Sequence, residues 1–472
     1  MRNLTKTVSE FAAGITYDDL PAAVQTRAKQ LIFDMTGVAL RSRHDAESTP
    51  SLIAAVEKLG FAGGTCSVIG DGRGYTAPGA ALLNGTLAHS LDFDDTHATG
   101  SIHPSAPIVP AAFAAAEMTQ ESGKSTSGQD VVAAIVAGYE IQIRLSLALG
   151  PSDHYNRGFH PTATCGIFGA VAAAGRIFGQ DADTIASAFG IALSQAAGSM
   201  QFLHEGGWTK RSHVGQAAMN GLMAATLAGE GFRGALDPLE GKAGFLNAYA
   251  PNPDPAKAVG GLGDHWETLA IAVKPYPSCR YSHAPLDAIR QLMANHDISV
   301  DEIEAVRVGV SQTAWNIIGG PEDLKHNPKS VVDGQFSMPF CAAVVMRTGN
   351  LVWDDYARHI ADPDTLALCR KVTTVVGERA EAAFPVNMAG GVEITTARGV
   401  FEAFIEEPKG EPGNFVTDEE LRAKFDGLVG PYLDGEKTEA LAAGLLNLDQ
   451  VDSITDLLAH SRPGDVLAMA GE

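Results

Sequence analysis

The residues best suited to moving protons are concentrated between positions 89 and 105. This stretch contains three histidines, three carboxylates and a threonine: His89, Asp92, Asp94, Asp95, Thr96, His97 and His103. A histidine titrates near neutral pH and a neighbouring carboxylate can orient it, so the cluster suits general acid–base catalysis. The same residue types also ligate metals, or cap the N–H groups at the start of a helix. An acid–base site, a metal site and a structural helix end therefore all stay open here.

Two further segments place histidine or cations at the start of an expected helix. His160 stands before Pro161, which fits a first helical turn, so we expect His160 at the N-cap with its ring free. Lys210 and Arg211, followed by His213, precede a helix rich in small residues and could bind a carboxylate or phosphate. The plainer alternatives are a histidine that only caps its helix and an exposed basic turn.

A fourth segment, residues 274–283, carries charge at an expected domain boundary. Two prolines stiffen it, and its side chains include Lys274, Cys279, Arg280 and His283. It could bind an anion, or it could be an interdomain hinge with solvated charges. Cys279 could be a nucleophile, but nothing in the sequence indicates a thiolate environment.

The elements that position these segments change character near residue 269. Before it, apolar residues recur at helical spacing over 21–40, 131–149, 162–178 and 214–227, without convincing strand alternation. Residues 1–268 are therefore expected to form an all-helical domain.

After residue 269, strand patterns appear beside helices. They cover 306–310 and 372–376, and a hairpin is expected from 392–396 and 400–405 with Gly399 at its turn. Residues 269–415 are thus expected to form an α+β domain. Thr417 and Glu420 form a capping box, after which residues 416–472 are helical and are expected to return to the first domain.

Composition excludes several classes of protein. Among 472 residues, 34 Lys and Arg face 56 Asp and Glu, a net charge of −22, which argues against nucleic acid and anionic membrane surfaces. Five cysteines without a CxxC pair argue against disulfides and a cysteine zinc site. The N-terminus has no signal-like apolar region, and the longest uncharged stretch, 184–203, reads as a buried helix pair. We expect a cytoplasmic protein that does not bind membranes.

The segments resemble one family when taken together and in order. LNGTLAHSLDFDDTH with HPS, RGFHPTATCGIFGA, TKRSHVGQAAMNG and KPYPSCRYSH, extended by TDEELRAKF, are similar to the MmgE/PrpD family. That family contains 2-methylcitrate dehydratases, cis-aconitate decarboxylases and iminodisuccinate epimerase. The resemblance implies a mainly α fold, with a large helical domain and a smaller α+β lid, a site between them, and usually a homodimer.

The resemblance also implies which residues line the pocket: Asp92, Thr96, His103, His160, Lys210 and Lys274. We hypothesise that His103 and His160 are the catalytic proton-transfer pair, with Asp92 orienting one of them. The expected substrate-binding residues are Thr96, Lys210, Lys274, Cys279, Arg280 and His283. Cys279 stands where the decarboxylase branch has a histidine.

The reactions of this family share one chemical step, a proton transfer next to a carboxylate. We expect a lyase acting on a small di- or tricarboxylate without a cofactor or metal, most simply a 2-methylcitrate- or citrate-type dehydratase. The alternatives are a cis-aconitate-type decarboxylase, an epimerase of a dicarboxylate such as iminodisuccinate, a non-catalytic carboxylate-binding member and a metal-dependent hydratase. The four site segments, without TDEELRAKF, contain five of the 34 cations: Arg157, Lys210, Arg211, Lys274 and Arg280. We therefore expect a locally positive pocket on a negative surface.

Overall fold

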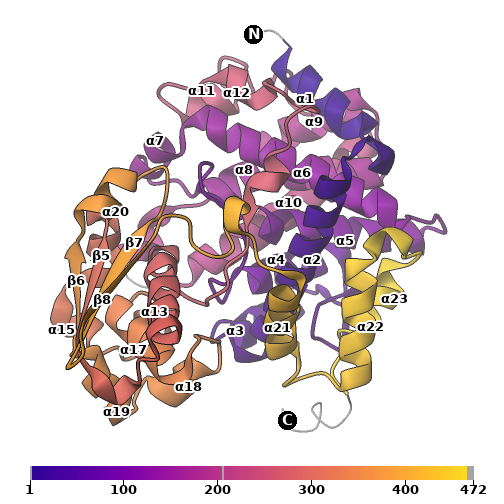
Figure 1. Ribbon diagram of the computed structural model, residues 1–472. Coiled ribbons are helices and arrows are strands. Elements are labelled where there is room, and N and C mark those ends of the chain that lie inside the picture. Colours follow the sequence, from indigo (N-terminus) through magenta and orange to yellow (C-terminus); the bar gives the residue numbers. More distant parts are fainter. Residues whose placement is uncertain (1–2, 205–206, 465–472) are drawn as a thin grey trace. The chain divides into compact units, whose positions relative to one another are not determined.

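The computed structural model describes residues 3–204 and 207–464, and its contacts divide the chain into two units (Figure 1). The first unit runs to Ala272 and includes the residues from Leu421 onward; the second is Val273–Glu420. The expected boundaries, after residues 268 and 415, lie four and five residues before these. Each unit is described by itself below.

The first unit is built from helices. They are α1 (Leu4–Gly14), α2 (Ala22–Asp45), α3 (Thr49–Lys58), α4 (Ala77–Ala88), α5 (Ser105–Glu121), α6 (Gly128–Leu149), α7 (Pro151–Asn156), α8 (Pro161–Ile177), α9 (Ala182–Leu193), α10 (Thr209–Gly229), α11 (Phe245–Tyr249), α12 (Pro255–Val259), α21 (Asp418–Val429), α22 (Gly435–Leu446) and α23 (Ile454–Ala459). The four helices expected from periodicity are all present, within a few residues of the expected ends.

Glycines let the central helices of this unit approach closely. Helices α4, α5, α6, α8 and α10 pack on one another, and their facing surfaces are buried. A Cβ on Gly215 of α10 would lie 2.3 Å from the Leu82 carbonyl oxygen of α4, and one on Gly85 would lie 2.7 Å from the Cα of Gly215. The α4–α10 contact therefore requires glycine on both sides. This contact fixes the position of residues 89–104, which follow α4, relative to Lys210 on α10.

The first unit also contains two small antiparallel ribbons that the all-helical expectation misses. Strand β1 (Ala62–Ser67) pairs with β2 (Gly74–Tyr75), and β3 (Thr96–His97) pairs with β4 (Ile271–Ala272). Strand β1 is glycine-rich and irregular in register, and the others span two residues each. The two-residue strands are too short for an alternating pattern, and the glycines and small residues of β1 supply no apolar alternation.

One helix among the described residues, α6, is long and apolar enough to cross a membrane, but 94% of its apolar window is buried inside the protein. It is a core helix. The uncharged stretch at 184–203 contains α9 and a 3₁₀ segment, Met200–His204, instead of the expected pair of helices.

The second unit is a four-stranded sheet with helices. The strand order is β6 (Val372–Val376), β5 (Ile303–Val310), β7 (Gly390–Thr396) and β8 (Gly399–Ile405). Only the β5–β6 pair is parallel. The β7–β8 pair is the expected hairpin, with Gly399 at a φ of 129°. The sheet packs against α13 (His283–His296) and α17 (Met338–Thr348) (Figure 1).

The remaining helices of this unit are short: α14 (Gln312–Ala314), α15 (Glu322–Lys325), α16 (Val331–Gln335), α18 (Asp355–His359), α19 (Pro363–Cys369) and α20 (Glu378–Ala383). At its end, the Thr417 N–H donates to Glu420 and the Glu420 N–H to the Thr417 hydroxyl, at 2.8 and 3.2 Å, which confirms the capping box.

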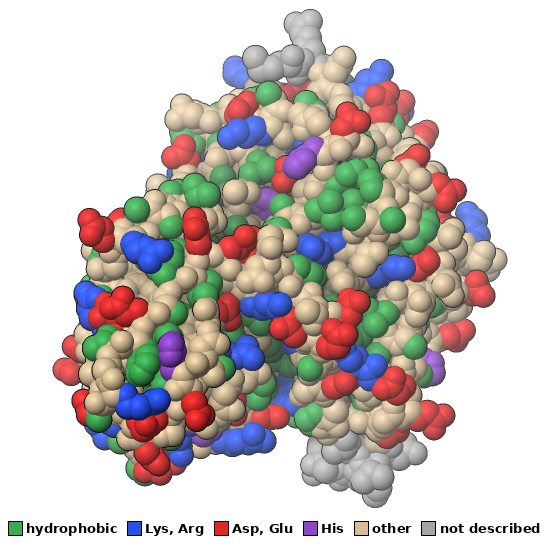
Figure 2. All heavy atoms as spheres, in the orientation of Figure 1, with side chains coloured by type: hydrophobic (Ala, Val, Ile, Leu, Met, Phe, Trp, Pro, Cys, Tyr) green, Lys and Arg blue, Asp and Glu red, His purple; other side chains and the backbone are tan. Residues whose placement is uncertain are grey.

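Figure 2 shows cationic and acidic side chains interspersed on the face drawn, so that face is not uniformly negative.

Candidate active site

Three helices of the first unit begin around the His/Asp segment, residues 89–104, which joins the end of α4 to the start of α5. The His103 backbone N–H donates to the Thr162 hydroxyl at the start of α8, at 3.3 Å. The Lys210 ammonium in the first turn of α10 reaches Asp92 at 2.9 Å. The starts of α5, α8 and α10 therefore converge on one place, and helix N-termini favour negatively charged groups.

Asp94 is the carboxylate that contacts two histidines. Its Oδ2 atom lies 2.7 Å from Nδ1 of His89 and 3.3 Å from Nδ1 of His103. Burial disfavours the charge on Asp94, but the two imidazoles outweigh burial and hold its pKa well below the ordinary value. An ionised carboxylate only accepts hydrogen bonds, so the Nδ1–H of His89 is the donor. Burial lowers the pKa of His89 to about 4, so this ring is neutral at pH 7.

His160 lies at the N-cap of α8, followed by Pro161, as expected. It is 1% exposed, and its ring lies 5.8 Å from that of His89, centroid to centroid. His89 also packs edge-on against His103 at 4.6 Å. Burial lowers the pKa of His160 well below the ordinary value, and nearby cationic groups add to the effect. The expected proton-transfer histidines, His103 and His160, thus both contact the ring of His89.

Lys210 is a cation in the first turn of α10, where the helix dipole disfavours positive charge. Burial lowers its pKa, but the ion pair with Asp92 outweighs burial and raises the pKa above the ordinary value. Lys210 is therefore charged at neutral pH. Asp92 was expected to orient a histidine, but it pairs with Lys210, and Asp94 contacts the histidines instead.

Asp95, the residue after Asp94, belongs to a second buried network. It accepts from the backbone N–H of Ser105 at 3.2 Å and bonds the Ser105 hydroxyl, which lies 2.6 Å from the Tyr139 hydroxyl. Burial raises the pKa of Asp95 to about 8, Ser105 opposes this rise, and the charge of Asp94 adds to it. Asp94 and Asp95 are adjacent in the chain yet differ in charge at pH 7.

His97 shapes the loop. Its Nδ1 accepts from the Gly100 N–H at 3.0 Å, and its Nε2 lies 3.2 Å from Glu267, so both nitrogens are engaged. Thr96 is buried in β3, where its backbone pairs with Ala272. The His97 side chain is fully buried, whereas that of His103 is 15% exposed.

The other expected substrate-binding residues lie in the second unit, where they are buried: Lys274, Cys279, Arg280 and His283. Arg280 pairs with Glu411. The Cys279 N–H donates to the Gln335 carbonyl at 2.9 Å, and His283 begins α13 with Nε2 3.3 Å from the Ser278 carbonyl oxygen.

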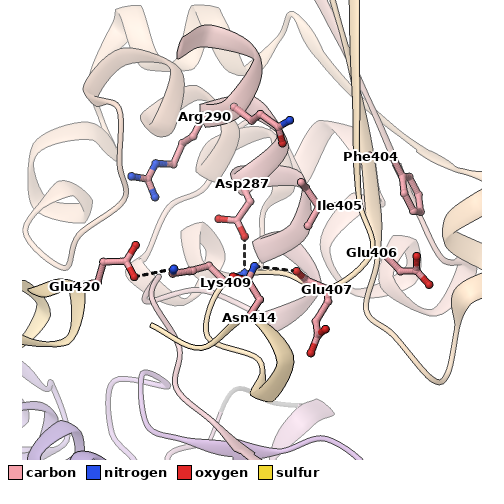
Figure 3. Close-up of a pocket in the computed structure, with 10 residues that line it drawn as sticks. Asp287, Arg290, Phe404, Ile405, Glu406, Glu407, Lys409, Asn414 and Glu420 are labelled. Atoms are coloured by element: carbon pink, nitrogen blue, oxygen red, sulfur yellow. Dashed lines mark hydrogen bonds and ion pairs between the residues drawn. The ribbon is translucent and has the colours of Figure 1, made fainter. Parts of the chain in front are cut away.

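A hollow of about 390 Å³ also lies on the second unit (Figure 3). Two of its carboxylates are bound by Lys409: the ammonium lies 2.9 Å from Glu420, and the backbone N–H donates to Asp287 at 2.7 Å. Arg290 and Lys409 are its two cations, against four carboxylates: Asp287, Glu406, Glu407 and Glu420. This balance does not suit a polycarboxylate.

A divalent metal is the alternative occupant of the histidine cluster. Ligand atoms of His89, Asp94 and His103 lie within 4.8 Å of one another, and two histidines with a carboxylate suit such an ion. A metal taking Nδ1 of His89 would have to displace the proton that now satisfies Asp94. The observed contacts are those of a carboxylate that accepts from His89 and faces His103.

Comparison with known proteins identifies the class to which this fold and site belong. The MmgE/PrpD N-terminal domain model matches residues 6–258 and the C-terminal domain model residues 276–450, so the chain belongs to the MmgE/PrpD family.

Curated relatives match over nearly the whole chain. A cis-aconitate decarboxylase-like protein of Aspergillus oryzae is 30% identical over 97% of each chain. A cis-aconitate decarboxylase of Aspergillus terreus is 31% identical over 96% of this chain and 95% of its own. The human cis-aconitate decarboxylase is 24% identical, over 99% and 96% respectively. These names fit the decarboxylase alternative better than the expected dehydratase.

Proposed function

We propose that the chain is a lyase that removes CO2 from a small unsaturated tricarboxylate of the cis-aconitate type, without a cofactor. One observation carries the proposal: His103 and His160 approach the same buried ring beside a charged lysine, where three helices begin. The relatives named cis-aconitate decarboxylases support CO2 loss over loss of water.

The reaction needs a place for negative charge and a source of one proton. As the bond to the departing carboxylate breaks, its electron pair forms a new double bond. The electrons of the old double bond move to the carbon beside another carboxylate, and that carbon takes up a proton. The trianion and one proton thus give CO2 and a dianion. A cation such as Lys210 stabilises the developing charge, which spreads onto the adjacent carboxylate.

In this proposal His103 and His160 are the proton-transfer pair, and Lys210 binds a substrate carboxylate. Asp94 occupies the Nδ1 side of His103, which leaves Nε2 as the nitrogen available to substrate. Asp92 holds Lys210 at the start of α10 until a carboxylate shares it. The three helix N-termini add to the attraction for an anion.

A substrate screen tests the reaction. The purified enzyme is incubated with cis-aconitate, citrate, 2-methylcitrate and iminodisuccinate, and products are identified by proton NMR. We expect CO2 and a five-carbon unsaturated diacid from cis-aconitate. Loss of water from citrate or 2-methylcitrate would instead identify a dehydratase, and proton exchange without net conversion an epimerase. We also expect full activity after exhaustive chelation. If activity were lost on chelation and regained when a metal is added, the metal-free reaction would be contradicted.

Two variants test the residues. His103→Gln and His160→Gln are each expected to lower kcat about 100-fold or more, because positioned proton transfer contributes about 10² to 10⁴ in rate. His265→Gln is the matched control, since its side chain is 72% exposed and outside the cluster. Near-wild-type turnover in both cluster variants would overturn the assignment.

A further inference from the structure

We propose that His213 is a positioning residue for His160: it occupies Nδ1 of His160 and thereby leaves Nε2 as the nitrogen that exchanges a proton with substrate. This inference rests on the proposed function and adds a residue outside the expected proton-transfer pair. It starts from a contact between two imidazoles.

The two rings are held by different helices. His160 is fixed at the start of α8, where its N–H donates to the Gly198 carbonyl at 2.9 Å and its carbonyl accepts from Ala163 and Thr164 at 3.1 Å. His213 follows Lys210 by three residues on α10, so both side chains share a helix face. Nδ1 of His213 lies 3.4 Å from Nδ1 of His160.

A contact between two such nitrogens is attractive only if one of them carries a hydrogen. Each neutral imidazole has one N–H and one acceptor nitrogen. Burial lowers the pKa of both His160 and His213, so both rings are neutral at pH 7 and one proton lies between them. The ring of Phe202 packs edge-on against both, at 6.4 and 5.9 Å between centroids, and offers no competing hydrogen bond.

The contact with His213 determines which ring nitrogen of His160 is left for substrate. The second nitrogen of an imidazole points away from the first, so pairing at Nδ1 turns Nε2 away from His213. If His160 gains a proton at Nε2, its Nδ1–H donates to neutral His213, and a hydrogen bond from a charged ring is stronger than one from a neutral ring. The buried His160 thereby shares its charge with a ring that is only half-buried.

His103, the other histidine of the proposed proton-transfer pair, also has a partner at Nδ1. Asp94 faces Nδ1 of His103, and His213 faces Nδ1 of His160. Each histidine thus presents Nε2 and has its own Nδ1 partner. One partner is an anion and the other is neutral, so the two rings have different surroundings, as a pair with separate acid and base roles requires.

Two substitutions and two readouts test the pairing. His213→Phe removes the partner, whereas His213→Asn keeps an amide that can donate or accept. We expect His213→Phe to lower kcat about tenfold or more with KM within about twofold, and His213→Asn to recover most of the loss. Wild-type kcat in His213→Phe, or equal losses in both folded variants, would overturn the inference.

Nitrogen-15 NMR of labelled histidines tests the pairing without substrate. The His160 signals, assigned by their loss in His160→Gln, should show one fixed tautomer in the wild type and a mixture in His213→Phe. If His213→Phe does not fold, the wild type decides: two freely exchanging tautomers of His160 would refute the pairing. An enzyme inactive on every acid would refute the proposed function alone, since the NMR result does not depend on turnover.

Discussion

Replacing Asp95 with asparagine should raise the free energy of unfolding relative to the wild type, by an amount that grows as the pH rises. Asp95 is 1% exposed and bonded to Ser105, and burial raises its pKa to about 8 from 3.8. The folded state therefore favours the neutral carboxyl. This stability is fully present below pH 4, where the unfolded chain also holds the proton, and is lost as the pH rises to 8. Asparagine resembles the neutral form and can keep both contacts with Ser105.

The size of the effect follows from the pKa. Between the ordinary pKa of 3.8 and the folded-state pKa of about 8, each pH unit lowers the free energy of unfolding by about 1.4 kcal/mol. This dependence on pH becomes weaker near the upper pKa. From pH 6 to pH 8, Asp95 should therefore lower the free energy of unfolding of the wild type by about 2 kcal/mol. Because asparagine does not titrate, the variant should gain that amount relative to the wild type over this interval.

Urea unfolding of wild type and Asp95→Asn at pH 6, 7 and 8 measures the difference. Comparing the two proteins at each pH cancels every other titrating group that both share. Asp264→Asn, at an exposed position, is the matched control and should show no such trend. A difference between Asp95→Asn and wild type that stays flat or shrinks from pH 6 to pH 8 would refute the account of Asp95 as a neutral acid.

Three further substitutions have definite expected outcomes. Lys210→Met should lower kcat/KM about 10- to 100-fold in steady-state assays, since a hydrogen bond to a charged group contributes about 1.5–3 kcal/mol; an unchanged value would remove Lys210 from the site. Asp94→Asn should lower kcat about 100-fold, because a neutral amide no longer stabilises positive charge on the neighbouring imidazoles during proton transfer, and unaltered kcat would contradict this. Lys424→Met should lower the free energy of unfolding by about 3 kcal/mol, because it leaves Asp34 buried without the ammonium 2.6 Å away. Adding Asp34→Asn should recover much of that loss, and no recovery would show that the ion pair is not its cause.

Much of the fold follows from local patterns in the sequence. Strand β6 coincides with the expected 372–376, and the β7–β8 hairpin turns at Gly399 as expected, because alternation and turn chemistry are local signals. The β3–β4 ribbon escapes such reasoning. Its strands have two residues each and lie more than 170 residues apart, so only the packed chain brings them together.

The site is predictable in composition but less so in its pairing. His160 at a helix start and Lys210 beside small residues have readable signals. No sequence signal shows that Asp94, and not Asp92, contacts the histidines. Asp92 adopts a φ of 53°, a left-handed conformation, and this turn sends two acids only two residues apart to different partners.

His213 shows a further limit of the sequence. Its position beside a cationic pair suggests anion binding, whereas its contact in the structure is another histidine. That contact depends on how closely α10 approaches its neighbours, and the α4–α10 approach requires glycine at two positions distant in the sequence. Spacing along one helix cannot reveal which ring a neighbouring helix supplies.

The most direct test of the central claim is the deuterium content of the product formed from cis-aconitate in heavy water. Proton-coupled CO2 loss predicts a five-carbon diacid with one deuterium on the carbon that becomes a CH2 beside a carboxylate, formed at the rate of CO2 release. A product that retains all six carbons, or a diacid without solvent deuterium at that carbon, would contradict the account.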